Sequence, residues 1–213
     1  SGEGADTINT AGGNDEITVA AAGKANTDTM DGGDGTDVLK LSAGAHTFGD
    51  NDKLANIEKI ETHADGSEVV VSAQKEALEI TGGAGVDKIT SGEGADTINT
   101  AGGNDEITGG KGIDTINAGD GNDEITGGVG NDIITGGAGA DTYLYKQTYQ
   151  SNSGSHDTIL DFDSSEDRID ISNITSGASV SRTLSNGTRF KLDTDNNGSY
   201  EMEFELTGYT GTA

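Results

Sequence analysis

Residues 82–144 read, in consecutive nines, GGAGVDKIT, SGEGADTIN, TAGGNDEIT, GGKGIDTIN, AGDGNDEIT, GGVGNDIIT and GGAGADTYL. In every unit the fourth residue is Gly, the sixth is Asp and the eighth is large and apolar. The aspartates are Asp87, Asp96, Asp105, Asp114, Asp123, Asp132 and Asp141. The apolar residues are Ile89, Ile98, Ile107, Ile116, Ile125, Ile134 and Tyr143. A fixed period of this kind is typical of a fold that stacks one small structural unit many times.

A shorter block of the same repeat lies at the N-terminus. Residues 1–18 are identical to residues 91–108, and GKANTDTMD and GGDGTDVLK follow after four extra residues. The aspartates of this block are Asp6, Asp15, Asp28 and Asp37. The identical copies are offset by 90 residues, which is ten nines, so the spacing is compatible with one shared phase along the fold.

Each position of the unit has a physical meaning. Glycines at positions two and four allow a positive φ and a close approach of backbones, so the first six residues predict a turn. The last three residues, such as TIN, predict a short strand whose middle side chain points inward. Two nines then form one coil with two strands, and coils stack about 4.8 Å apart. The core is a single file of isoleucine in each sheet.

Stacked coils place like charges together, because aspartates 18 residues apart fall on the same edge. Carboxylates about 5 Å apart repel by roughly 3 kcal/mol per pair at an effective dielectric near 20. Several such pairs outweigh a typical net stability of about 5–15 kcal/mol. The chain has 12 Lys and Arg against 38 Asp and Glu, so its own cations are too few. Carboxylate and carbonyl oxygens favour a hard divalent cation, and calcium over magnesium.

The nonapeptide resembles the RTX (repeats-in-toxin) calcium-binding repeat, GGxGxDxUx with U a large apolar residue, over residues 1–40 and 82–145. The resemblance implies an all-β fold, a right-handed parallel β-roll with Ca²⁺ stacked between its coils. It also implies that the sixth-position aspartates and the carbonyls of positions one to four bind the metal. The glycines expected at these sites are Gly83, Gly85, Gly92, Gly94, Gly103, Gly110, Gly112, Gly119, Gly121, Gly128, Gly130, Gly137 and Gly139. A disordered glycine-rich linker is the alternative, but a linker has no reason to keep Asp and Ile in register.

Neighbouring aspartates on one edge define the expected metal sites. The main block offers the pairs Asp87/Asp105, Asp105/Asp123, Asp123/Asp141, Asp96/Asp114 and Asp114/Asp132. The N-terminal block offers Asp6/Asp28 and Asp15/Asp37. Lys24, Ala25 and Asn26 depart from the repeat, so the Asp6/Asp28 site is the least secure. We expect about five to eight calcium ions in all.

Residues 41–81 lack the nonapeptide but contain strand-like segments at Ile57–Ile60, Val69–Val71 and Leu78–Ile80. Their spacing predicts further coils of the roll with longer turns and no calcium. A small separate bulge is the alternative, and LANIEKIE is also compatible with a helical turn. We expect His46 and His63, in this acidic strand region, to lie on the surface.

The C-terminal region, residues 146–213, predicts strands at HDTILDF (156–162), DRIDIS (167–172), RFKLD (189–193) and YEMEFEL (200–206). An open solenoid end needs a cap, and these strands predict an antiparallel or irregular one. The segment 136–206 resembles the C-terminal part of serralysin-type proteases and mannuronan epimerase R-modules. That resemblance implies that Asp157 completes the last calcium site beside Asp132. DTDNNG (193–198) predicts a hairpin turn, with a weak calcium site as the alternative.

Composition excludes several functions. A net charge of −26 disfavours nucleic acid and anionic membranes. No apolar run approaches the roughly 18 residues of a membrane span, so no membrane insertion is expected. The absence of Cys removes disulfides and thiolate chemistry. No HExxH or GxSxG motif is present, so we expect a non-catalytic module without a catalytic residue.

These features predict a calcium-driven folding and export module. An acidic chain held open by its own charge would pass the type I secretion machinery unfolded and fold on meeting calcium outside. We expect a monomeric, C-terminal part of a secreted or cell-surface protein of a Gram-negative bacterium. Because Ser1 falls inside a repeat, we expect a piece of a larger protein. The first choice of parent is an RTX adhesin, and a secreted enzyme is the alternative.

Two other binding functions stay open. Outward Thr97/Asn99 and Thr115/Asn117 resemble the ranks of ice-binding solenoids, although only two ranks are consecutive. The resemblance to epimerase R-modules implies that a groove of the roll binds a polysaccharide or a cell-surface glycan.

Overall fold

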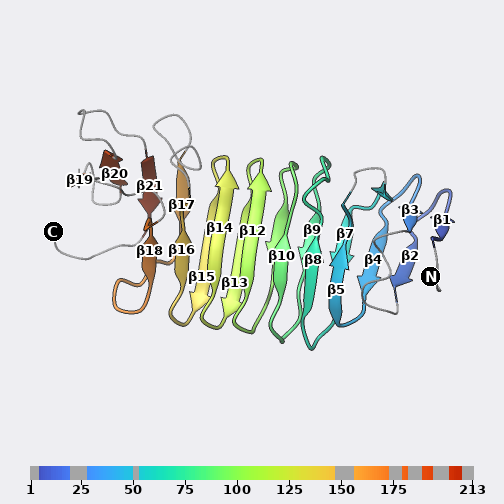
Figure 1. The fold of residues 1–213 in the computed structure, drawn as a ribbon, viewed down its shortest axis with the longest axis horizontal. Helices are drawn as coiled ribbons and strands as arrows, with labels where there is room; N and C mark the ends of the chain where they lie inside the picture. The colour runs from blue at the N-terminus through green and yellow to red at the C-terminus, as the bar shows by residue number, and fades with distance from the viewer. Residues whose placement is uncertain are drawn as a thin grey trace.

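The protein is an elongated parallel β-solenoid whose coils stack from the N-terminal to the C-terminal end (Figure 1). The computed structural model describes residues 5–19, 28–49, 53–146, 156–172, 179–181, 189–193 and 202–207. The elements that lie wholly within these residues are all strands. The predicted all-β parallel roll is therefore confirmed.

Two long sheets form the two faces of the roll. The first sheet runs, in spatial order, through β2 (Glu16–Val19), β4 (Val38–Leu41), β7 (Lys59–Glu61), β9 (Glu79–Thr81), β11 (Thr97–Asn99), β13 (Thr115–Asp120), β15 (Ile133–Ala138), β17 (Asp157–Ile159), β21 (Met202–Leu206), β20 (Arg189–Asp193) and β19 (Ser179–Ser181). The second runs through β5 (Gly44–Thr47), β8 (Ser67–Val70), β10 (Lys88–Thr90), β12 (Glu106–Lys111), β14 (Glu124–Val129), β16 (Thr142–Leu144) and β18 (Arg168–Asp170). A short third sheet at the N-terminal end holds β1 (Thr7–Asn9), β3 (Thr29–Asp31) and β6 (Leu54–Ala55).

The core is a file of apolar side chains behind each sheet, as predicted. In the first sheet Ile98 pairs with Ile116, which pairs with Ile134. In the second sheet Ile107 pairs with Ile125, which pairs with Tyr143. All are buried. Burial of each such side chain is worth about 1.5–3 kcal/mol, so the roll gains stability in proportion to the coils that stack.

The predicted division into a six-residue turn and a three-residue strand holds at β10 and β11 and is wrong at β12 to β15. Each of these four strands has six residues and continues through positions one to three of the next unit. Glycine is the reason. Gly119 has a φ of 107°, and a Cβ there would lie 2.0 Å from the carbonyl oxygen of Ala101. Only a residue without a side chain lets adjacent coils approach closely enough to extend the ladder of hydrogen bonds.

The segment between the two repeat blocks runs within the same sheets. Leu39 pairs with Ile60, Ile60 with Ile80, and Ile80 with Ile98. On the other face β8 pairs with both β5 and β10. The sequence LANIEKIE forms β6 and β7 rather than a helical turn.

His46 corrects a second expectation. It is fully buried rather than on the surface, at an inward position of β5 paired with Val69. The Nε2 atom lies 2.8 Å from the carbonyl oxygen of Ser42, so a backbone hydrogen bond satisfies one ring nitrogen inside the core. His63 is exposed, as expected.

The two identical 18-residue copies do not share a phase. Ile17 lies in the first sheet, whereas Ile107, its counterpart in the second copy, lies in the second sheet. The reason is the length of the coils near the N-terminus. Successive core partners Ile17, Leu39, Ile60 and Ile80 are 22, 21 and 20 residues apart instead of 18.

The C-terminal strands form the predicted cap. Strand β21 adds to the first sheet parallel to β17, and β20 and β19 follow in antiparallel pairs. The predicted hairpin turn at residues 193–198 lies outside the described residues from 194 onward. No helix in the described part of the chain has the length and apolar character to span a membrane.

Candidate metal centre

The sixth-position aspartates lie at the edges of the roll, each in the turn before a strand. From Asp28 to Asp141 their exposed fraction is between 0% and 2%, and only Asp6 and Asp15 are half-buried. The apolar residue two positions later fixes this location, because its side chain must enter the core. The two-residue spacing between Asp and the core residue therefore places a row of buried carboxylates along each edge of the roll.

The carboxylates form two rows, which we name the first Asp ladder (Asp87, Asp105, Asp123, Asp141) and the second Asp ladder (Asp96, Asp114, Asp132). In each ladder the Oδ1 atom accepts the backbone N–H of the aspartate in the preceding coil. The distances from N to Oδ1 are 2.8 Å for Asp87 to Asp105, 2.7 Å for Asp105 to Asp123, 3.0 Å for Asp123 to Asp141, 2.9 Å for Asp96 to Asp114 and 2.9 Å for Asp114 to Asp132. The N-terminal pairs behave alike, at 2.9 Å for Asp6 to Asp28 and 2.7 Å for Asp15 to Asp37. All seven predicted pairs are thus brought together.

Three acidic residues outside the repeat extend these rows. Asp157 accepts the N–H of Asp132 at 3.0 Å, in the place predicted for it. Asp167 accepts the N–H of Asp141 at 2.9 Å, and a carboxylate oxygen of Glu58 accepts the N–H of Asp37 at 2.7 Å. Sequence reasoning missed Asp167 and Glu58. The Asp-x-Ile pattern of residues 167–169 is the sequence feature that could have identified Asp167. Glu58 lies at the same spacing before Ile60.

The Oδ2 atom of most sixth-position aspartates, in the two Asp ladders and in the N-terminal pairs, is buried and has no hydrogen-bond partner within the described residues. These aspartates are Asp15, Asp28, Asp37, Asp105, Asp114, Asp123, Asp132 and Asp141. A buried carboxylate oxygen without a donor costs several kcal/mol unless a cation or a proton compensates it. These atoms therefore mark where a cation fits.

Asp87 and Asp96 differ, because protein donors reach both oxygens of each carboxylate. Asp87 accepts the N–H of Ser67 at 2.7 Å on Oδ1 and the N–H of Gly83 at 2.9 Å on Oδ2. Asp96 accepts the N–H of Leu78 on Oδ1 and the hydroxyl of Ser91 on Oδ2. Both ladders thus begin, beside the non-repeat segment, with a carboxylate that is already satisfied.

Backbone carbonyls are the other available donors. Within the described residues no three His, Asp or Glu side chains converge on one point, so a bound metal needs oxygens from the turns. Every glycine predicted as a site residue faces the preceding coil, where an added Cβ would lie 1.5–2.5 Å from a carbonyl oxygen. Carboxylate and carbonyl oxygens in a flexible arrangement suit Ca²⁺, so the residues fit the metal that the repeat implies.

Burial, rather than repulsion along the ladder, is the largest cause of the altered acidity of these groups. It raises the pKa of Asp114 to about 7, of Asp123 to about 6 and of Asp132 to about 6. Neighbouring carboxylates raise the pKa of Asp114 and Asp123 further, while backbone hydrogen bonds lower it. Burial likewise raises the pKa of Asp157 to about 8. Burial therefore adds to the repulsion between stacked carboxylates and makes a compensating cation or proton more necessary.

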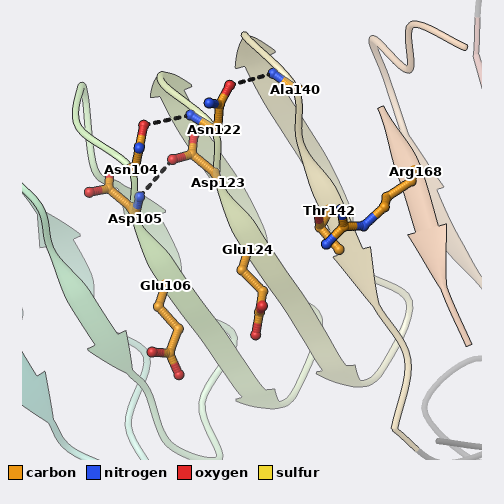
Figure 2. A pocket seen from close by; sticks show the side chains of 9 residues that line it. All are labelled: Asn104, Asp105, Glu106, Asn122, Asp123, Glu124, Ala140, Thr142 and Arg168. Carbon is orange, nitrogen blue, oxygen red and sulfur yellow. Dashed lines mark hydrogen bonds between the residues drawn. The ribbon is translucent and has the colours of Figure 1, made fainter. Parts of the chain in front are cut away.

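A polar hollow of about 570 Å³ lies on the second sheet beside the first Asp ladder (Figure 2). At one side of it, Asn104 Oδ1 accepts the N–H of Asn122, and Asn122 Oδ1 accepts the N–H of Ala140, at 2.9 and 2.8 Å. The other lining residues are Asp105, Glu106, Asp123, Glu124, Thr142 and Arg168. The hollow thus combines carboxylates with one guanidinium group.

The outward face of the first sheet carries the two Thr-x-Asn ranks. Thr97 pairs with Thr115 and Asn99 with Asn117, and all four are exposed. Glu79 precedes these ranks in register, and Ile133 follows them. The Thr-x-Asn pattern therefore covers two adjacent strands, β11 and β13.

The fold and its two Asp ladders define a calcium-binding β-roll module. The RTX calcium-binding nonapeptide repeat matches the chain in four copies, at residues 1–20, 22–45, 79–107 and 108–143. These copies cover just over half of the chain, which therefore belongs to the RTX calcium-binding nonapeptide repeat family. Modules of this family are typically non-catalytic, and RTX proteins are typically secreted by the type I route.

One similar solved structure is the solution structure of the AlgE6R3 subunit of the mannuronan C5-epimerase from Azotobacter vinelandii. The sequences are 26% identical, the match covers 68% of this chain and 73% of that chain, and the TM-score is 0.30. None of the curated proteins matches the chain.

Proposed function

We propose that the chain is a calcium-driven folding and export module at the C-terminal part of a secreted or surface RTX protein. The observation that carries this proposal is the row of buried Oδ2 atoms without a hydrogen-bond partner in the described residues. The roll needs a compensating cation at each of them, so its folding free energy depends on the metal.

The ligands we assign are the Oδ2 atoms of Asp105, Asp123 and Asp141 on one edge and of Asp114 and Asp132 on the other, together with turn carbonyls. Asp15, Asp28 and Asp37 supply the N-terminal sites. Asp87 and Asp96 stabilise their turns through protein donors instead. When bound, calcium supplies the positive charge that lets adjacent carboxylates be buried together.

Export follows from the same dependence. With a net charge of −26 and no metal, the chain is held open by self-repulsion, which suits passage through a secretion channel. Outside the cell, calcium binds only the folded state and shifts the equilibrium toward it. Folding after passage also prevents the chain from slipping back.

An adhesin is our first choice of parent protein. The identical copies at residues 1–18 and 91–108 support it, because such sequence identity is typical of long repetitive surface proteins. A secreted enzyme that carries this module is the alternative parent.

A second candidate function is the binding of a neutral glycan in the polar hollow of Figure 2. Glu106 and Glu124 lie opposite each other on β12 and β14 and are suited to accept hydrogen bonds from sugar hydroxyls. Calorimetric titration with neutral oligosaccharides tests this function, and a signal lost in E106A/E124A at saturating calcium supports it.

The main proposal is tested by circular dichroism of the chain during calcium titration. We expect coil in chelator and β-structure with calcium. Magnesium at equal concentration and sodium chloride at equal ionic strength are the controls, and we expect neither to fold the chain. Equal folding in either control overturns coordination in favour of charge screening.

A further inference from the structure

We propose that, in the second Asp ladder, the first residue of the nonapeptide decides whether its turn takes a cation, and that Ser91 fills the place of calcium beside Asp96. The inference rests on the proposed calcium binding and identifies the residue that sets which turns take part. It concerns the first position of the nonapeptide, which is not among the glycines predicted above as site residues.

The second Asp ladder provides the comparison. Its three units begin with Ser91, Gly109 and Gly127 and end their turns with Asp96, Asp114 and Asp132. The Oδ2 atom of Asp96 accepts the hydroxyl of Ser91, five residues earlier in the same turn. Within the described residues, the Oδ2 atoms of Asp114 and Asp132 are buried and accept no hydrogen bond. The Oδ1 atoms of all three accept a backbone N–H at 2.8 or 2.9 Å, so the ladder contact is the same.

The geometry at the glycine units shows why the first residue matters. A Cβ on Gly127 would lie 2.5 Å from Oδ2 of Asp132, and one on Gly109 would lie 2.6 Å from Oδ2 of Asp114. A side chain at this position therefore enters the space that the carboxylate oxygen faces. With glycine, that space stays available to a ligand of Oδ2.

Threonine at the same position shows that a hydroxyl must also direct its proton correctly. Thr100 donates to the carbonyl of Ala118 at 2.9 Å, and Thr10 donates to the carbonyl of Gly32 at 2.6 Å. A hydroxyl has one proton, so the Oδ2 atoms of Asp105 and Asp15 remain without a donor in the described residues. Ser91 instead donates to its own aspartate, which gives Asp96 a neutral partner in place of a cation.

The location of Ser91 fits this role. Its turn stacks on the non-repeat segment, where the N–H of Leu78 already occupies Oδ1 of Asp96. A hydroxyl donor closes the end of the ladder without calcium.

The test counts bound calcium by equilibrium dialysis on the full chain. We expect S91G to bind one ion more than the unsubstituted protein and G127S to bind one ion fewer. The matched controls are S172G and G49S, since Ser172 is exposed and a Cβ on Gly49 meets nothing within 4 Å. Both controls are expected to keep the original count.

The outcomes separate the two proposals. If the unsubstituted chain binds no calcium, the proposed function fails. If it binds calcium but S91G leaves the count unchanged, the assignment of Ser91 is overturned and the proposed function stands. The G127S count is read only when circular dichroism at saturating calcium matches that of the unsubstituted chain. If G127S does not fold, the S91G count alone decides.

Discussion

The backbone N–H of Asp114 donates to Oδ1 of Asp132 at 2.9 Å, while the second oxygen of Asp132 is buried with no hydrogen-bond partner in the described residues. One oxygen of each carboxylate thus joins two coils, and the other faces its own turn. The same side chain provides a structural contact that needs no metal and a ligand atom that does. A substitution can therefore remove the metal ligand while it keeps the hydrogen bond between the coils.

The first prediction concerns Asp114, which lies between two neighbours of its ladder. D114N keeps an oxygen that can accept the N–H of Asp96 but removes the anion. We expect the calcium midpoint of folding to rise several-fold, with a loss of about 1.5–3 kcal/mol at fixed calcium. D6N should have a smaller effect, because Asp6 lies at the end of its row and is half-buried. The exposed substitution D120N is the control, and an equal effect of D120N would show that net charge alone governs folding.

The second prediction concerns pH in calcium-free protein. Burial raises the pKa of Asp114 to about 7 and of Asp132 to about 6, above the value of about 3.9 in an unfolded chain. The folded state then binds more protons than the unfolded state between these values, so stability falls as pH rises. The contribution of these carboxyls is fully present below about pH 4 and is lost as pH rises toward about 7.

Thermal unfolding of calcium-free protein at pH 4 and pH 7.5 measures this effect. We expect a higher melting temperature, or more β-structure, at pH 4. The opposite order would contradict the burial of protonated carboxyls in the metal-free roll.

The third prediction concerns the approach of adjacent turns. Gly121 has a φ of 147°, and a Cβ there would lie 1.5 Å from the carbonyl oxygen of Gly103. G121A must therefore separate two coils or distort the turn, at a cost of more than about 3 kcal/mol. Chemical unfolding in saturating calcium measures the loss, with G49A as the matched control that should change stability by less than about 0.5 kcal/mol. A stability of G121A within that range would show that the turns are not in contact.

The fourth prediction concerns the C-terminal end of the first Asp ladder. Asp167 accepts the N–H of Asp141 and that of Asp163, at 2.9 and 2.8 Å. D167A leaves both donors unpaired and should cost about 1–3 kcal/mol. Proteolysis near residue 160 at saturating calcium should accelerate, whereas E166A, at an exposed neighbour, should match the unsubstituted protein. Equal rates in the two variants would remove Asp167 from the ladder.

The sequence was sufficient for the features that repeat. Asp and Ile two residues apart, with period nine, predicted the two files of isoleucine and the pairing of aspartates such as Asp105 with Asp123. Asp157 lies beside Asp132, where the resemblance of its surroundings to a known cap places it, and its role as a calcium ligand stays a prediction. These predictions succeeded because each unit meets only its neighbours, so local spacing determines contacts.

The remaining features depend on contacts that the repeat does not encode. His46 is buried because it takes an inward position of β5 opposite Val69, where the carbonyl of Ser42 lies within hydrogen-bonding distance of its ring. The six-residue strands arise because glycines in stacked turns meet each other, which is a property of pairs of coils. Glu58 serves where Asp would in the repeat, since its longer side chain reaches the N–H of Asp37. None of these relationships is visible in a single nonapeptide.

The second nonapeptide of the identical copies lies in the first sheet in one copy and in the second sheet in the other, so a nonapeptide does not itself determine the side of the roll on which it lies. A gene that gains or loses one nine-codon unit would therefore keep every downstream coil foldable. Each downstream nonapeptide would move from one sheet to the other. Surface chemistry, such as the Thr-x-Asn ranks or the polar hollow, would move to the other side in a single genetic event. Evolution of such a protein can change the side chains on one face of the roll while the core stays the same.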